Sequence, residues 1–359
     1  MSETILRAGE AARRRRKPDH HRATAEEINK LYGTNHVQQT RVSEPPSPSS
    51  SSSDSLASTM ANTWYHIMLG STLKKKLSTM ERFCAWSGIL YMGLAFGCIL
   101  SPSLVSLAFN LRLDTIGQGY ARLAGVSFLA IGLCYIITAH TSPQLMTGKR
   151  ILLGTVFERL IYVNLVLVLL HVKFGGELLF TCACMLMDTV LAIITYILWV
   201  RETPDASISS ALPWASKKVL QLLPPSCEPS TRKSSSVVQV IGYLQGMLGT
   251  LFMISPELAQ QVLKLPPSEG MSRFTLGLCM MCYAVIGIFH IFAGAANSLP
   301  FNILAVFYRL AIIIPVVSCL AVLQLADLNL ALLFIGCDSI MAFVICLFLY
   351  LEGLQMKHN

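Results

Sequence analysis

Five ionisable side chains lie inside apolar stretches that are long enough to cross a membrane. Four of them form two Arg and Asp pairs and the fifth is a glutamate: Arg159 with Asp188, Arg309 with Asp338, and Glu158. An ionised side chain within a membrane span is costly unless it is paired or wetted. These residues therefore predict either buried ion pairs or a polar cavity that binds an anionic group or relays protons.

The helices that carry Arg159 and Asp188 must be antiparallel, because only the short loop from Lys173 to Glu177 joins them. Counted from the cytosolic helix ends, Arg159 lies roughly 12 Å deep and Asp188 roughly 18 Å deep at the α-helical rise. A long arginine side chain can bridge most of that difference. We therefore predict one ion pair between Arg159 and Asp188 and, by the same reasoning, another between Arg309 and Asp338.

Two interpretations of these pairs stay open. In the structural one, each pair fixes the register of its helical hairpin; in the functional one, the charges line a wet intramembrane site. Glu158 has no charged counterpart, because Tyr308 stands at the matching position, so it is the residue most suited to chemistry or coupling. The alternative is that Glu158 lies near the cytosolic interface and reaches water. His290 could likewise contact a ligand or be a packed, hydrogen-bonded core histidine.

Other motifs point to no enzyme class. Cys279 and Cys282 have the CxxC spacing, but within a span each can serve as a small apolar residue, and no cluster of His or Asp accompanies them. The sequence has no HExxH, Walker A, GxSxG or GxGxxG element in a usable context. We therefore expect no catalytic residues, no cofactor and no metal site.

The composition is that of a membrane protein. Of the 359 residues, 53% are hydrophobic and only 13% are charged, whereas soluble domains carry about 25% charged residues. The net charge of +8 is concentrated in the N-terminal region and in short connections, where anionic lipid headgroups are nearer partners than nucleic acid. Most of the eleven cysteines lie in apolar stretches, which argues against an extracellular disulfide framework.

The sequence predicts an all-α integral membrane protein with eight transmembrane helices, arranged as two tandem four-helix bundles. Each predicted span has about the 20 residues that the hydrocarbon requires. The spans are 83–100, 123–139, 151–172, 178–200, 237–254, 274–296, 301–325 and 330–351.

Polar segments divide the chain. The expected divisions are a disordered basic and Ser-rich cytosolic tail at 1–62, an interfacial amphipathic segment at 63–82, membrane units at 83–200 and 237–352, a cytosolic linker at 201–236 and a short tail at 353–359. The basic run from Arg13 to Lys17 could be a nuclear signal, a retention address or a plain solvated tail. Together with Lys74 to Lys76 it could also bind anionic lipid.

Lys and Arg counts in the connections predict the orientation. Twelve lie on the side of the N-terminus and five on the opposite side, so the positive-inside rule puts both termini in the cytosol.

The two halves match segment by segment. Ser101 and Pro102 recur as Ser255 and Pro256, and Arg122 and Arg273 each open a predicted helix. The Arg and Asp pairs recur 150 positions later. Because a four-helix unit enters and leaves on the same side, the predicted repeat is parallel, with a pseudo-twofold axis along the membrane normal.

Short motifs in the first unit resemble those of small four-helix membrane proteins of DoxX-like architecture and of the p53-inducible protein 11 type. The resemblance rests on Ser101-Pro102, on Arg122 to Gly125, and on Arg159 and Asp188, and it extends over residues 83–352. The second copy departs from the pattern at Arg273 to Leu276. The resemblance implies the four-helix fold and carries no activity.

Two functions from different classes follow. The first is a transporter or binding module with a polar intramembrane site for a small solute, ion or lipid. The second is a non-catalytic membrane scaffold or adaptor, in which the buried Arg and Asp residues are structural. A cavity shared by Glu158, Arg159 and Asp188 would favour the first, and a dry packed interior the second.

Overall fold

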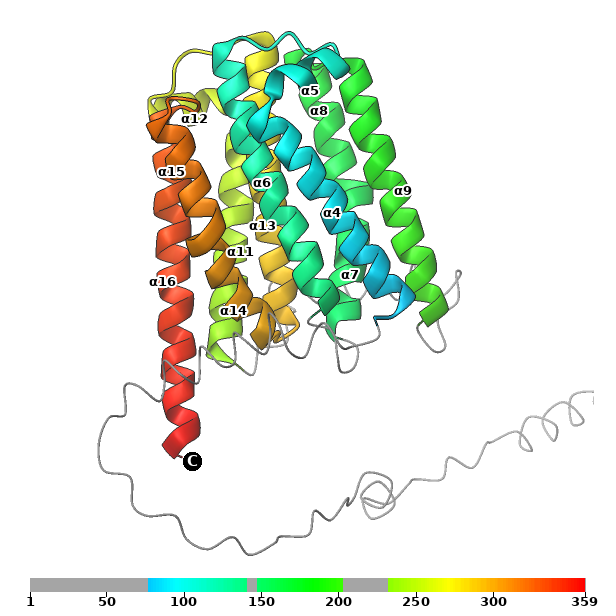
Figure 1. Ribbon diagram of the computed structural model, residues 1–359, viewed down its shortest axis with the longest axis vertical. Helices are drawn as coiled ribbons and strands as arrows, with labels where there is room; N and C mark the ends of the chain where they lie inside the picture. Colours follow the sequence, from blue (N-terminus) through cyan, green and yellow to red (C-terminus); the bar gives the residue numbers. More distant parts are fainter. Residues whose placement is uncertain (1–76, 141–146, 203–231, 359) are drawn as a thin grey trace, which may run out of the picture. The chain divides into compact units, whose positions relative to one another are not determined.

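The computed structural model describes residues 77–140, 147–202 and 232–358, and the regular secondary structure in these ranges is helical (Figure 1). The predicted tail at 1–62, with Arg13 to Lys17, lies outside the described residues, as do Lys74 to Lys76 and most of the predicted linker.

Eight helices within the described residues are long and apolar enough to cross a membrane, and they coincide with the eight predicted spans. The chain is therefore a multi-pass helical membrane protein. The six uninterrupted spans are α4 (Thr79–Leu100), α6 (Thr115–His140), α9 (Leu178–Glu202), α11 (Lys233–Ile254), α13 (Gly270–Ala295) and α16 (Leu328–His358). The third span is formed by α7 (Thr147–Phe157), η2 (Glu158–Val163) and α8 (Asn164–Phe174), and the seventh by α14 (Leu299–Tyr308), η3 (Arg309–Ile313) and α15 (Ile314–Val322).

Local side chains set helix boundaries that hydropathy alone misplaces. The second span begins at Thr115 rather than at the predicted Leu123, because the Asp114 carboxylate accepts a hydrogen bond from the Gly117 N–H at 2.6 Å, as an N-cap does. Arg122 is consequently the eighth residue of α6 and does not open it. The first span begins at Thr79, where Ser78 forms a capping box with Glu81, so the end of the predicted interfacial segment belongs to α4.

Two short helices, absent from the sequence prediction, follow the first and fifth spans. They are α5 (Pro102–Ala108) and α12 (Pro256–Leu263), and both lie at the same end of the long helices (Figure 1). Each starts with a proline, whose fixed φ and missing N–H suit the first helical turn. The recurring Ser-Pro motif is therefore a helix start rather than a simple loop.

Both interrupted spans contain a π-helical segment, a wider turn that the sequence analysis did not predict. The segments begin at Glu158 and Arg309, so Glu158 and both arginines of the ion pairs lie directly on them. A π turn replaces some α-helical hydrogen bonds. In the first half, the Asn164 side chain donates to the Leu160 carbonyl at 3.3 Å. In the second half, Pro315, which has no N–H, is the second residue of the helix α15 that follows the π segment.

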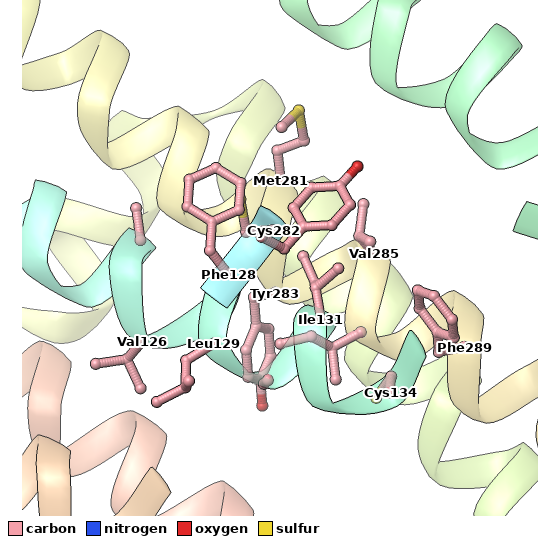
Figure 2. Close-up of a cluster of buried hydrophobic side chains, with 14 of the residues drawn as sticks. Val126, Phe128, Leu129, Ile131, Cys134, Met281, Cys282, Tyr283, Val285 and Phe289 are labelled. Atoms are coloured by element: carbon pink, nitrogen blue, oxygen red, sulfur yellow. The ribbon is translucent and has the colours of Figure 1, made fainter. Parts of the chain in front are cut away.

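Helices α6 and α13 lie at the centre of the helical assembly. Their most hydrophobic stretches are 83% and 94% buried, against 28% for α16. Figure 2 shows the apolar side chains that both helices contribute to the core, among them Phe128 and Ile131 of α6 and Met281 and Phe289 of α13. The other spans expose large apolar side chains, as expected of surfaces that face lipid.

Glycines bring two helix pairs into close backbone contact. A Cβ on Gly132 of α6 would lie 2.7 Å from the Gly88 carbonyl of α4. A Cβ on Gly287 of α13 would likewise lie 2.7 Å from the Gly242 carbonyl of α11. Small residues permit such close crossings within membranes. Each half therefore has a tightly packed helix pair that includes one central helix.

Candidate functional site

The first polar cluster joins Arg159 on η2 with Asp188 on α9. The Arg159 Nε lies 3.7 Å from the Asp188 Oδ1, and both side chains are at most 8% exposed. The predicted ion pair is therefore confirmed. At this distance it is an electrostatic contact rather than a hydrogen bond.

Two tyrosines complete this cluster. The Tyr91 hydroxyl of α4 donates a hydrogen bond to Oδ1 of Asp188. The guanidinium of Arg159 lies 4.3 Å from the centre of the Tyr135 ring and 5.5 Å from that of Tyr91. The two rings stack with their centres 5.5 Å apart. Arg159 is thus held largely by cation–π contacts.

Glu158 is buried beside this pair. Its exposed fraction is 5%, so the expectation that it reaches water at the interface is wrong. Glu158 and Arg159 are the first two residues of the π segment, and both are buried. The Glu158 carboxyl is within electrostatic reach of Arg159 and Asp188.

Three polar atoms of the first cluster lack hydrogen-bond partners among the described residues. They are Oε2 of Glu158 and both Nε and Nη2 of Arg159, and all are buried. Such groups are rare in proteins, and each is a sign of a bound water, ion or ligand or of a functional role. The first cluster therefore has unused hydrogen-bonding capacity for both donors and acceptors.

The second cluster joins Arg309 on η3 with Asp338 on α16, also as predicted. The Arg309 Nε donates to Oδ1 of Asp338 at 3.0 Å, and Nη1 donates to the Ala305 carbonyl at 3.3 Å. Nη2 lies 2.9 Å from Nε2 of His290, on α13. All three nitrogens of Arg309 are therefore engaged, unlike those of Arg159.

The contact with Arg309 fixes the state of His290. Arginine can only donate, so Nε2 must accept, which means that the imidazole is neutral and carries its proton on Nδ1. The Tyr308 hydroxyl lies 3.2 Å from the same Nε2. The structure thus places the sequence candidate His290 in a fully buried network with Arg309 as its direct partner, and its Nδ1 has no hydrogen-bond partner among the described residues.

The clusters occupy matching places but use different side chains. Tyr91 and Gln245 are each the thirteenth residue of a 22-residue helix, α4 and α11. Tyr135 and His290 are each the twenty-first residue of a 26-residue helix, α6 and α13. The second cluster therefore has a histidine where the first has a tyrosine ring over its arginine.

Little space lies beside Asp338 of the second cluster. Asp338, Tyr308 and Gln245 line a cavity of about 10 Å³, which is barely the size needed to hold one water molecule.

Cys279 and Cys282 of the CxxC motif are buried, free thiols on α13. Among the residues that the structure describes, no group of three or more His, Cys, Asp or Glu could hold a metal ion.

The remaining candidates, Arg122 and Arg273, lie apart from both clusters. The Arg122 Nη1 donates to the Leu325 carbonyl at 3.3 Å, which ties α6 to the loop after α15. Arg273, near the start of α13, pairs with Glu257 of α12 at 3.1 Å. Both contacts hold neighbouring segments together. The two arginines lie at different positions in their helices, Arg122 as the eighth residue of α6 and Arg273 as the fourth residue of α13.

The sequence analysis missed Tyr91, Tyr135 and Gln245. The signal available was a polar group within an apolar span, at the same helix position in α4 and α11 and in α6 and α13. Comparison of the chain with protein-family models, curated proteins and solved structures found no match. The geometry of the two clusters is therefore the guide to function.

Proposed function

We propose that the protein binds a small polar solute or ion within the membrane, at the cluster of Glu158, Arg159 and Asp188. The observation that carries this proposal is the difference in hydrogen bonding between the two arginines, Arg159 with its neighbour Glu158 on one side and Arg309 on the other. Buried groups without partners cost about 1–3 kcal/mol each. Three such atoms persist around Glu158 and Arg159, whereas the nitrogens of Arg309 are all engaged.

The charges of the first cluster restrict which kinds of ligand could bind there. Glu158 and Asp188 supply two carboxyl groups against the single positive charge of Arg159, whereas Asp338 balances Arg309 beside a neutral histidine. The excess acid favours a proton or a cationic group, and the free Arg159 nitrogens favour an acceptor beside it. A proton carried with water, or a small solute with both a donor and an acceptor group, fits these requirements. Transport of that solute is the functional extension of the binding.

A second candidate is a non-catalytic membrane scaffold. Both Arg side chains are 1% exposed and both Asp side chains 8%, as expected of pairs that fix helix register in a dry interior. The small volume beside Asp338 favours this role for the second cluster in particular.

We further infer that residues 83–200 and 237–352 are tandem copies of one four-helix unit. The same order of long, short, long, π-interrupted and long helices occurs twice, and each π segment carries the arginine of an ion pair. An even number of spans and the distribution of Lys and Arg support cytosolic termini. On that side, the basic runs from Arg13 to Lys17 and Lys74 to Lys76 would meet anionic lipid.

The test uses the full chain in proteoliposomes that contain a trapped pH-sensitive dye. Proton flux under an imposed pH gradient and binding of radiolabelled small amines, carboxylates and amino acids are measured for wild type and Glu158→Gln. The matched control is Tyr308→Phe, at the corresponding position of the second half. Thermal unfolding is followed for each variant and for the exchange of Arg159→Asp with Asp188→Arg.

The binding proposal requires that Glu158→Gln abolish flux or solute binding without lowering the unfolding temperature, while Tyr308→Phe leaves both activities in place. The scaffold role is supported if Glu158→Gln changes neither proton flux nor solute binding, and if the charge exchange restores the stability that each single variant loses.

A further inference from the structure

An apolar groove lies between α11 and α16 in the second half. Its volume is about 510 Å³, within the usual range for ligand sites. Its walls include Val240 and Leu244 of α11 and Ile340 and Met341 of α16, and Tyr283 of α13 lies at its base. The lining is almost entirely hydrocarbon, so the groove suits an apolar molecule.

The groove opens on a surface that faces lipid. Val240, Leu244 and Ile340 are 57%, 64% and 66% exposed, and all three belong to predicted membrane spans. Access is therefore from the bilayer, which selects molecules that dissolve in it. None of the lining residues, all within the described ranges, is charged, which favours an uncharged occupant.

One buried polar side chain at this groove has an atom with no hydrogen-bond partner among the described residues. Gln245 lines the groove and is 3% exposed, and its Oε1 has no hydrogen-bond partner among the described residues. In the first half, the matching residue Tyr91 fills its place with a ring and donates to Asp188. Gln245 therefore has an unused buried acceptor, whereas the Tyr91 hydroxyl is hydrogen-bonded.

We propose that this groove binds an uncharged membrane lipid with a hydroxyl group, whose hydrocarbon lies between α11 and α16 and whose hydroxyl donates to Gln245. A hydroxyl is the neutral donor that satisfies a buried amide oxygen, and hydrocarbon is the complement of the remaining lining. The site is independent of the solute site at Glu158, because it belongs to the other half of the chain and is entered from the lipid.

The experiment uses the full-length protein in lipid nanodiscs and two photoreactive probes. The first is hexadecan-1-ol with a mid-chain diazirine and a terminal alkyne; the second is its methyl ether, which cannot donate. Labelled peptides are mapped, and binding is measured by competition with unlabelled hexadecanol. The variants are Gln245→Leu, which removes the acceptor, and Leu244→Trp, which fills the groove.

Leu90→Trp is the matched control for Leu244→Trp. Leu90 and Leu244 are each the twelfth residue of their helices, α4 and α11, and both are exposed. A second filling variant, Ile340→Trp, tests the opposite wall in case Leu244→Trp unfolds. Thermal unfolding identifies which variants remain folded.

We expect the alcohol to label peptides of α11 and α16. Gln245→Leu should weaken its binding by about 3–10-fold, the value of one hydrogen bond, and leave the methyl ether unchanged. Filling the groove should abolish labelling, and Leu90→Trp should not. A further variant, Leu244→Cys, tests whether a second copy covers the groove. The proposal is overturned if labelling is spread over all lipid-facing helices, if Gln245→Leu affects both probes equally, or if Leu244→Cys forms disulfides between two copies and no probe enters.

Discussion

At the scale of single residues, two similar ion pairs have unequal support. Arg309 is fixed by three partners with ordinary hydrogen-bond geometry, among them Asp338 at 3.0 Å. Arg159 is 3.7 Å from Asp188 and lies over the rings of Tyr91 and Tyr135. The second pair therefore stabilises the protein, whereas the first pair retains unused hydrogen-bonding groups that a bound solute or ion could satisfy.

This difference predicts unequal effects of neutralising the two aspartates. Asp338→Asn should lower the free energy of unfolding by about 3–5 kcal/mol, because it leaves Arg309 buried without its counter-charge. Asp188→Asn should cost clearly less, since Glu158 remains within electrostatic reach of Arg159. Chemical unfolding in mixed micelles measures both. Equal losses would mean that the two pairs have the same role.

Tyr91→Phe should destabilise the protein by about 1.5–3 kcal/mol, the value of a hydrogen bond to a charged group. The phenyl ring keeps the stacking on Tyr135, so the loss reports the hydroxyl bond to Asp188 alone. Tyr350→Phe, on an exposed side chain of α16, is the control and should leave the unfolding transition unchanged. A Tyr91→Phe protein as stable as wild type would argue against this bond.

The sequence predicted the ion pairs because depth along a helix can be counted from its ends. It did not predict Tyr91 or Tyr135, nor the contact between His290 and Arg309, because those depend on how each helix is rotated about its axis. A span that is apolar on all sides gives no moment from which to read that rotation.

At the scale of elements, hydropathy located every span but misjudged the details that backbone chemistry controls. The start of α6 depends on the Asp114 side chain, and the short helices depend on Pro102 and Pro256. The π segments escaped prediction because a wider turn leaves the apolar pattern nearly unchanged.

The helix crossings are open to a matched test on α4. A Cβ on Gly88 would lie 2.6 Å from the Gly132 carbonyl, whereas one on Gly93 would meet nothing within 4 Å. Gly88→Ala should therefore push α4 and α6 apart and lower the unfolding temperature substantially. Gly93→Ala should be neutral or stabilising by up to about 1 kcal/mol through helix propensity. Similar behaviour of the two variants would contradict the close crossing.

At the scale of the whole described assembly, the second and sixth spans form a common centre. The hydrophobic cluster around them contains residues from both halves of the chain. Polar contacts also join the two halves, such as Tyr162 with Thr250 at 3.0 Å and Lys173 with the Ile254 carbonyl at 2.6 Å. The antiparallel pairing of span three with span four, and of span seven with span eight, can be predicted from the short loops that join them. The pairing of α6 with α13 cannot be predicted in this way, because no short loop joins these two helices.

Eight spans and cytosolic termini make a definite topology prediction. An N-glycosylation acceptor in a long flexible insert after Pro267, between α12 and α13, should be modified in microsomes, because this loop is predicted to lie on the luminal side. The same insert after Lys357 should not be modified. A gel-mobility shift that is reversed by glycosidase measures both. Modification at the C-terminal position would reverse the predicted orientation.

The two π segments also bear on the evolutionary origin of the two halves of the chain. Residues 159–163 and 309–313 of these segments coincide at an offset of 150, so two separate origins would require the same rare irregularity to arise twice at one site. If the halves descend from one ancestral unit, as inferred above, that irregularity and the arginine beside it are older than the duplication. The divergence of Glu158 from Tyr308, and of Tyr91 from Gln245, is younger. The two halves would then have begun as equals and acquired separate tasks afterwards.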